Sequence, residues 1–180
     1  LITGVSGVPK ETIGLIGEIK GNALMAIGRV KQNFPNFDLN TSETEDVNRY
    51  KNCLPDNLVP YFEAALKNFH YTKEALIEFE KPVLDLKKIG SLMNNHHAVL
   101  RDLLKITVPI IDDMINAALQ AGAYGAKIVG SGGGGSIVVI ADPDNENDVI
   151  EAILKAGALA AYGVNVDPGV RITENIEIEI

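Results

Sequence analysis

The sequence predicts an α+β fold in which helices pack on one face of a four-stranded, largely antiparallel sheet. Short apolar runs typical of strands lie near both ends of the chain, and long apolar stripes with helical spacing fill the middle. In the last third, a glycine-rich segment separates two further apolar runs. Helices that cluster between strands, rather than alternating with each strand, favour an antiparallel sheet that is covered on one side.

The first strand is expected at residues 1–5, before a turn that ends in Pro9. Proline is common in the first turn of a helix, so a helix should follow and run to about Gln32. Its buried face is expected to contain Ile16, Ile19, Ala23, Ile27 and Val30. Glycines at 14, 17, 21 and 28 weaken this helix, or permit close packing against a neighbour.

Three more long helices are expected in the middle of the chain. Residues 33–60 lack periodicity and predict a flexible loop with one short helix. The helices in excess of those that cover the sheet are expected to form a helical insertion. Apolar positions then recur at helical intervals over residues 58–79 and again over 85–104. Thr107 and Pro109 start the last of the three, and Gly122 ends it.

The last third predicts the rest of the sheet. Two apolar runs, 126–129 and 136–141, have the composition of buried strands. A helix at about 146–160 follows them, and then a short strand at 164–166. A final alternating run covers residues 170–180.

Composition restricts the possible functions. The 180 residues suit one domain, residues 1–180, and the net charge of −8 opposes binding to nucleic acid. No apolar stretch is long enough to cross a membrane. A single cysteine, Cys53, excludes an internal disulfide and favours a reducing compartment, so a cytoplasmic location is expected.

The most informative segment is Gly130-Ser131-Gly132-Gly133-Gly134-Gly135, which we call the glycine loop. Five glycines in six residues are expected where the backbone adopts positive φ or approaches a ligand closely. Backbone N–H groups in such turns form concave anion sites. A dinucleotide-binding motif would need a helix after the glycines, and a P-loop would need a following lysine. Neither is present, and a flexible linker or plain hairpin loop remains an alternative.

Several polar residues are candidates for a binding site. Lys127 precedes the glycine loop and could approach a phosphate, although a strand lysine is more often surface charge. His96 and His97 are adjacent, so they point in different directions on a helix and make a poor metal pair. His97 falls on the apolar stripe, which favours a hydrogen-bonded core residue.

Two other groups are ordinary unless a partner motif accompanies them. His70, Tyr71 and Tyr50 could contact a sugar, but helices and loops commonly carry such residues. The acidic run Glu43 to Asp46 could hold Mg²⁺, but its irregular spacing favours a solvated loop. We therefore expect no metal site and no catalytic residue in this chain.

Gly125 to Gly135 resembles the third conserved motif of the GHMP kinase superfamily, which includes galactokinase, homoserine kinase, mevalonate kinase and phosphomevalonate kinase. The usual motif is Gly-Ala-Lys, two residues, then Gly-Ala/Ser-Gly-x-Gly-Gly. The resemblance extends over essentially the whole chain, and its galactokinase-like character depends on His97 and the run Leu100-Arg101-Asp102. Further residues upstream that resemble the helical region of galactokinase-type members are Leu92, Met93, Asn94, Thr107, Pro109 and Asp112.

The resemblance implies a ferredoxin-like C-terminal domain of an ATP-dependent kinase. In this superfamily a leading domain carries a Pro-rich motif, a Gly-Ser-Ser-Ala nucleotide loop and usually a catalytic aspartate, and it binds most of the ATP and Mg²⁺. None of these appears here, so the isolated chain is expected to be inactive without its own N-terminal domain. The resemblance assigns the backbone of Gly130, Ser131, Gly132, Gly133 and Gly134 to phosphate or substrate binding.

Three functional readings remain open at this point. The first is a galactokinase-like enzyme that phosphorylates a sugar hydroxyl, and the second is a mevalonate-kinase-like enzyme of the same superfamily. The third is a stand-alone ferredoxin-like module that binds a metabolite through the same loop without catalysis.

Overall fold

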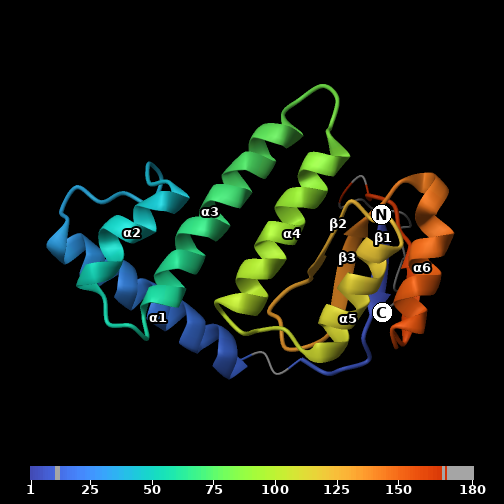
Figure 1. Cartoon of the computed structure of the whole chain (residues 1–180), viewed down its shortest axis with the longest axis horizontal. Helices are drawn as coiled ribbons and strands as arrows, with labels where there is room; N and C mark the ends of the chain where they lie inside the picture. The colour runs from blue at the N-terminus through green and yellow to red at the C-terminus, as the bar shows by residue number, and fades with distance from the viewer. Residues whose placement is uncertain (11–12, 168, 170–180) are drawn as a thin grey trace, which may run out of the picture.

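The computed structural model describes residues 1–10, 13–167 and 169. In that part of the chain, four strands form one antiparallel sheet in the order β2-β3-β1-β4. The strands are β1 (Ile2–Val5), β2 (Gly125–Ile128), β3 (Ser136–Ile140) and β4 (Ala160–Gly163). This order, with helices after β1 and after β3, is ferredoxin-like and confirms the predicted α+β class (Figure 1).

Two helices, α5 (Pro109–Gln120) and α6 (Glu146–Lys155), pack on one face of the sheet. Alternate strand residues such as Ile2, Ile137 and Val139 point toward these helices and are almost completely buried. Met114 of α5 and Ile153 of α6 meet above Gly4 of β1, where a Cβ atom would lie within 3 Å of both. The main apolar core therefore lies between the sheet and this helix pair.

The edge strand β2 is covered by α4 (Leu86–Asp102) rather than by another strand. Asn94 of α4 accepts a hydrogen bond from the Ala126 N–H at 2.9 Å and donates one to the Tyr124 carbonyl at 3.2 Å. Gly90 allows the close approach, because a Cβ there would lie 2.5 Å from the Tyr124 carbonyl carbon. The amide side chain thus satisfies backbone groups that an unpaired edge would leave exposed.

A second apolar core lies in the helical insertion, which is separate from the sheet in Figure 1. It contains α1 (Ile13–Asn33), α2 (Val47–Tyr50) and α3 (Val59–Phe79), with short 3₁₀ turns at Thr44–Asp46 and Lys51–Cys53. The rings of Phe37, Tyr50 and Phe62 pack against one another. Helices α3 and α4 form a hairpin that connects this core to the sheet. None of the described helices is both long and apolar enough to cross a membrane.

Two sequence predictions about the last third were wrong. The helix ends at Lys155 instead of about 160, because Gly157 adopts a φ of 102° that an α-helix cannot continue. The last strand is Ala160–Gly163, not 164–166, because pairing with β1 outweighs the weak strand propensity of its alanines. The expected alternating run at 170–180 lies outside the described residues.

The predicted buried face of α1 was only partly correct. Val30 is fully buried, but Ile19, Ala23 and Ile27 are half-buried and Ile16 is 44% exposed. The N-terminal half of α1 extends beyond the insertion core, so helical periodicity identified the helix without identifying which part of it is covered.

Candidate functional site

The glycine loop is the tight connection between β2 and β3. Gly130 and Gly132 to Gly135 all have positive φ, between 71° and 136°. Only glycine adopts such values in succession at low cost, because it has no Cβ. The loop therefore has a defined backbone path, which explains why five glycines occur within six residues.

Hydrogen bonds to two distant segments hold the loop in place. The Gly133 N–H donates to the Ile106 carbonyl at 2.7 Å, and the Gly135 N–H donates to the Val8 carbonyl at 3.0 Å. The Gly135 carbonyl in turn accepts from the Ser6 N–H at 2.8 Å. These contacts join the loop to the start of α5 and to the turn after β1, so it is not a flexible linker.

Close packing makes two of the glycines irreplaceable for steric reasons. A Cβ on Gly132 would lie 2.5 Å from the Ile106 carbonyl oxygen. A Cβ on Gly134 would lie 2.7 Å from the Val8 carbonyl oxygen and 2.9 Å from that of Pro9. Both positions are buried against backbone, which cannot move aside as a flexible side chain can.

A partly buried polar network adjoins the segment that holds the loop. Thr107, next to Ile106, donates its hydroxyl hydrogen to Asp112 Oδ2 at 3.0 Å. The other carboxylate oxygen of Asp112 lies 3.1 Å from His97 Nε2, and the His97 side chain is 3% exposed. The prediction that His97 is a hydrogen-bonded core residue is therefore confirmed. The network connects α4 with the start of α5, and its Thr107 directly follows Ile106, which contacts the glycine loop.

The protonation state of His97 follows from this environment. Burial lowers its pKa from the ordinary 6.5, and the Asp112 hydrogen bond and charge oppose this without reversing it. The other ring nitrogen, Nδ1, is buried and has no partner among the described residues. A neutral ring with its proton on Nε2 fits both facts, because a proton on Nδ1 would be buried without an acceptor.

Sequence reasoning missed Lys10, which lies beside the base of the loop. Its ammonium group donates to the Val129 carbonyl at 2.9 Å, and its side chain lies against Gly130 and Gly135. The only sequence signal was its place directly after Val8-Pro9, in the turn that follows β1. Lys10 therefore places a positive charge in contact with the glycine loop.

The loop donors are not equivalent. The Gly133 amide is already used by Ile106, whereas no described backbone carbonyl accepts from the amides of Gly130, Gly132 or Gly134. Backbone N–H groups in consecutive positive-φ residues, with the Lys10 ammonium beside the loop, have the chemistry of an anion site. The assignment of Gly130, Ser131, Gly132, Gly133 and Gly134 to phosphate or substrate binding stays a prediction.

Most other candidate residues lie away from the loop. Tyr50 is buried in the insertion core, and His70 lies between Glu43 and Glu74, with nitrogen to oxygen distances of 3.4 and 3.0 Å. The geometry therefore does not bring Tyr50 and His70 together as a sugar contact. Arg101 forms an ion pair with the adjacent Asp102 on the helix surface, at 2.8 Å.

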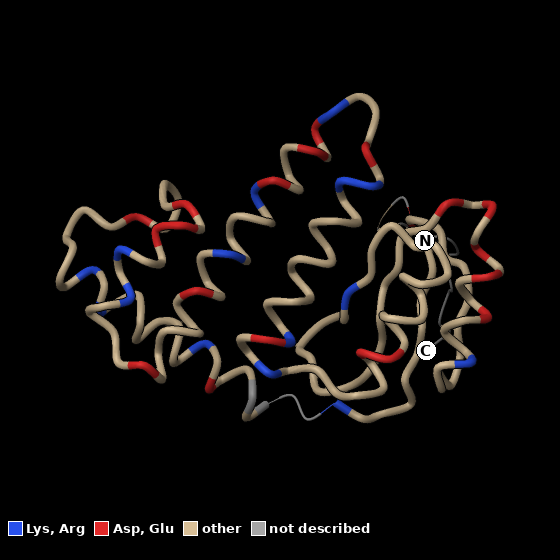
Figure 2. Tube along the Cα trace, in the orientation of Figure 1, with Lys and Arg blue, Asp and Glu red and all other residues tan. Residues whose placement is uncertain are grey.

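The acidic run has a local structural role. The Asp46 carboxylate accepts a hydrogen bond from the Glu43 N–H at 3.0 Å and caps the short turn Thr44–Asp46. Within the described residues, no three His, Cys, Asp or Glu side chains lie close enough together to hold a metal ion. Lysine and arginine residues are also interspersed with acidic ones along the described chain (Figure 2).

Comparison with known proteins identifies the family. Residues 72–161, half of the chain, match the family model "GHMP kinases C terminal". The chain is 32% identical to a mevalonate kinase of Thermococcus gammatolerans over 130 residues, which are 72% of this chain and 38% of that protein. It is 37% identical to a galactokinase of Streptomyces coelicolor over 76 residues, 42% of this chain and 20% of that protein. The chain thus spans about a third of the mevalonate kinases that it matches.

Solved structures show the same fold. A Lactococcus lactis galactokinase complexed with galactose superposes with a TM-score of 0.78 at 23% identity, over 89% of this chain and 43% of that one. A mevalonate kinase of L. major in complex with R-mevalonate gives a TM-score of 0.56 at 18% identity, over 89% and 40%. These likenesses show the shared fold, and the match of half the chain to the family model shows that the chain belongs to the GHMP kinase family, in the region of its C-terminal domain.

Proposed function

We propose that this chain is the C-terminal half of an ATP-dependent kinase that phosphorylates a hydroxyl group of a small molecule. The observation that carries the proposal is the glycine loop, which is ordered, has positive φ at five positions and rests on two backbone carbonyl groups. Phosphoryl transfer depends on positioning and on neutralising the charge that spreads over the transferred group. Fixed backbone donors meet that need without any reorganisation during the reaction.

In this proposal the loop forms one wall of the phosphate and substrate cleft. The amides of Gly130, Gly132 and Gly134 face the anion together with Ser131, and Gly133 keeps the loop on Ile106. The chain's own N-terminal domain supplies the opposite wall, most contacts to ATP and Mg²⁺, and the catalytic base. A purified chain of residues 1–180 should therefore show no phosphotransfer.

Two acceptors are candidates. A sugar acceptor is suggested by the galactokinase-like residues around His97, and it is consistent with the galactokinase relative at 37% identity. Mevalonate is favoured by the length of the sequence match, since mevalonate kinases at 30–34% identity cover 67–72% of the chain. The structural likenesses are below 25% identity and do not discriminate between the two acceptors.

The test is phosphotransfer from ATP by the full-length protein, with galactose and mevalonate assayed in parallel. Turnover of either acceptor supports the proposal and identifies the substrate class. A full-length protein that binds metabolites tightly by calorimetry, yet transfers phosphate to neither acceptor nor to homoserine or phosphomevalonate, would instead support the non-catalytic module. Gly132→Ala should reduce kcat, and Gly21→Ala on α1 is the control that should leave it unchanged.

A further inference from the structure

A pocket separate from the glycine loop opens on the sheet face that α5 and α6 leave uncovered. It lies between the α3–α4 hairpin and strands β2 and β3, with a volume of about 260 Å³. Most of its lining is apolar, and Leu1, Phe79, Ile89, Met93, Val138 and Ile140 contribute to it. A cavity of roughly 150 Å³ holds a benzene ring, so this pocket has room for an aliphatic chain of about eight carbons.

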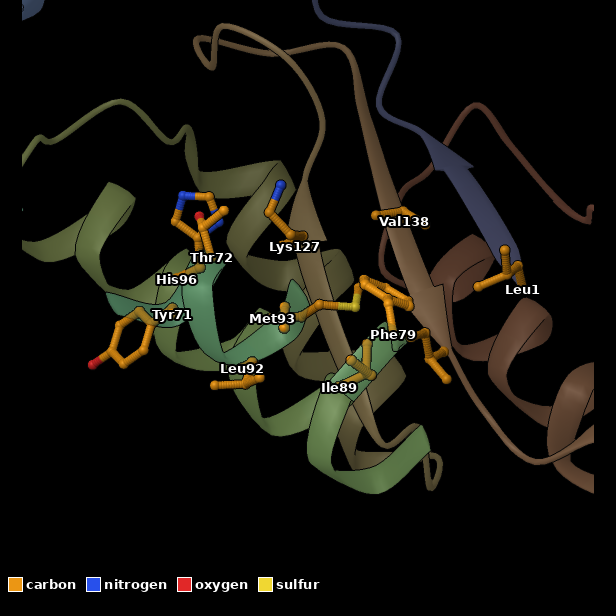
Figure 3. Close-up of a pocket in the computed structure, with 12 residues that line it drawn as sticks. Leu1, Tyr71, Thr72, Phe79, Ile89, Leu92, Met93, His96, Lys127 and Val138 are labelled. Carbon is orange, nitrogen blue, oxygen red and sulfur yellow. The ribbon is translucent and has the colours of Figure 1, made fainter. Parts of the chain in front are cut away.

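The polar side chains of the pocket gather toward one end. Figure 3 shows Thr72, His96 and Lys127 toward one side, and Phe79, Val138 and Leu1 toward the other, with Met93 between them. The pocket is therefore amphipathic along its length. A ligand that fits it has one polar end and one aliphatic end.

Lys127 is the residue that determines the charge of this polar end. It alternates with the core residues Ala126 and Ile128 along β2, so its side chain projects from the opposite face of the sheet. Its ammonium group donates to the carbonyl of the adjacent Ile128 at 2.9 Å, and no described carboxylate forms an ion pair with it. Burial lowers its pKa, as expected for a cation that lacks a compensating negative charge.

His96 adds a donor but no charge. Burial, and then the positive charge of Lys127, lower the pKa of His96 to about 4, so the imidazole is neutral near pH 7. A neutral imidazole still offers one N–H to an acceptor. The polar end therefore has a single positive charge, that of Lys127. A ligand with one negative charge would balance it. The second charge of a dianion would have no positive partner there, in a chain whose net charge is already −8.

We propose that this pocket binds a small monoanionic amphiphile, a carboxylate with an aliphatic tail, with its head group on Lys127 and its tail along Met93 and Val138. The competing interpretation is that the lysine stem only covers apolar surface while its head group reaches solvent. The two differ in one respect: only a true site prefers an anionic head group and depends on the lysine charge.

The test uses calorimetric titration of the full-length protein with octanoate and with 1-octanol, which has the same tail without the charge. Octanoate should bind at least about tenfold more tightly than octanol, because a charge-assisted hydrogen bond is added. Lys127→Met keeps an apolar side chain of similar length and should remove this preference, while octanol binding stays the same. The matched control is Lys20→Met on exposed α1, which should bind both ligands as the unmodified protein does.

A second variant locates the tail. Val138→Trp fills the pocket with a residue that strands tolerate, and it should abolish binding of both ligands while the circular dichroism spectrum stays unchanged. Equal affinity for octanoate and octanol, undiminished octanoate binding by Lys127→Met, or undiminished binding by folded Val138→Trp would each overturn the proposal. None of these outcomes bears on phosphotransfer, which is measured separately.

Discussion

Glycines occur at high density in two regions of this protein, the glycine loop and helix α1. They are required by the backbone in the loop but not in the helix. In the loop, five glycines have positive φ, and a Cβ at Gly132 or Gly134 would collide with backbone oxygen. In α1, Gly14, Gly17, Gly21 and Gly28 have no atom within 4 Å of a would-be Cβ, and none has positive φ. The number of glycines in a segment therefore does not show whether a side chain could replace them. Their φ values and the atoms near each would-be Cβ do show it.

The largest effect is expected from Gly132→Ala in the loop. The substitution combines a φ of 84° with a contact of 2.5 Å to the Ile106 oxygen, and it should lower the free energy of unfolding by about 3 kcal/mol. Urea denaturation measures this directly. If Gly132→Ala unfolds at the same urea concentration as the unmodified protein, the loop is not held by Ile106, and the contrast with α1 fails.

The next effect concerns the His97 network, which adjoins the segment that holds the loop, and it depends on pH. Because the folded-state pKa of His97 lies below 6.5, the unfolded chain takes up the proton first as the pH falls. The neutral His97 therefore contributes stability above pH 6.5, and this contribution is lost progressively as the pH falls below 6.5. Comparing unfolding at pH 7 and pH 5 in the unmodified protein and in His97→Gln checks it.

The Gln variant should lose less stability on acidification, because it has no proton to gain. His96, with a pKa of about 4, contributes a loss of the same sign, so His96→Gln with His97→Gln should reduce the dependence further. A His97→Gln protein with the full pH dependence would show that the buried network does not titrate as described.

An effect of opposite sign is expected in α1. Gly21 and Gly28 lie inside the helix with open space around them. Gly21→Ala and Gly28→Ala should therefore each raise the free energy of unfolding by about 0.5–1 kcal/mol. Thermal unfolding of both single variants measures the gain. A loss of stability in the full-length protein would indicate that these glycines lie against another part of it, and the two regions would then be alike.

The smallest effect is expected from Lys10→Met at the rim of the loop. The variant removes one exposed hydrogen bond, to the Val129 carbonyl, while keeping the apolar stem, and should cost about 0.5 kcal/mol or less. If Lys10 contributes to anion binding, the Michaelis constant for ATP should rise several-fold with little change in stability. Lys20→Met is the matched control for charge.

Sequence reasoning predicted the α+β class, the four long helices near their observed bounds and the loop between β2 and β3. These features depend on local signals: apolar periodicity, proline near helix starts, and a glycine cluster between two apolar runs. The same reasoning misplaced the last strand, since Ala160–Gly163 has little strand propensity and is a strand because β1 pairs with it. It also overestimated how much of α1 is buried.

The sequence by itself predicted that the backbone of the glycine loop adopts unusual conformations. Five glycines in six residues are costly to order, and they are expected only where positive φ or a close approach excludes a Cβ. Only the tertiary structure decided what holds it: the carbonyl groups of Ile106 and Val8, more than 20 and 120 residues away, and the adjoining network with its Asp112–His97 pair. Backbone carbonyls have no residue-type signature, so their positions become visible only when distant segments meet in space. The same holds for Lys127, whose apolar surroundings come from two helices and two strands that no local pattern connects.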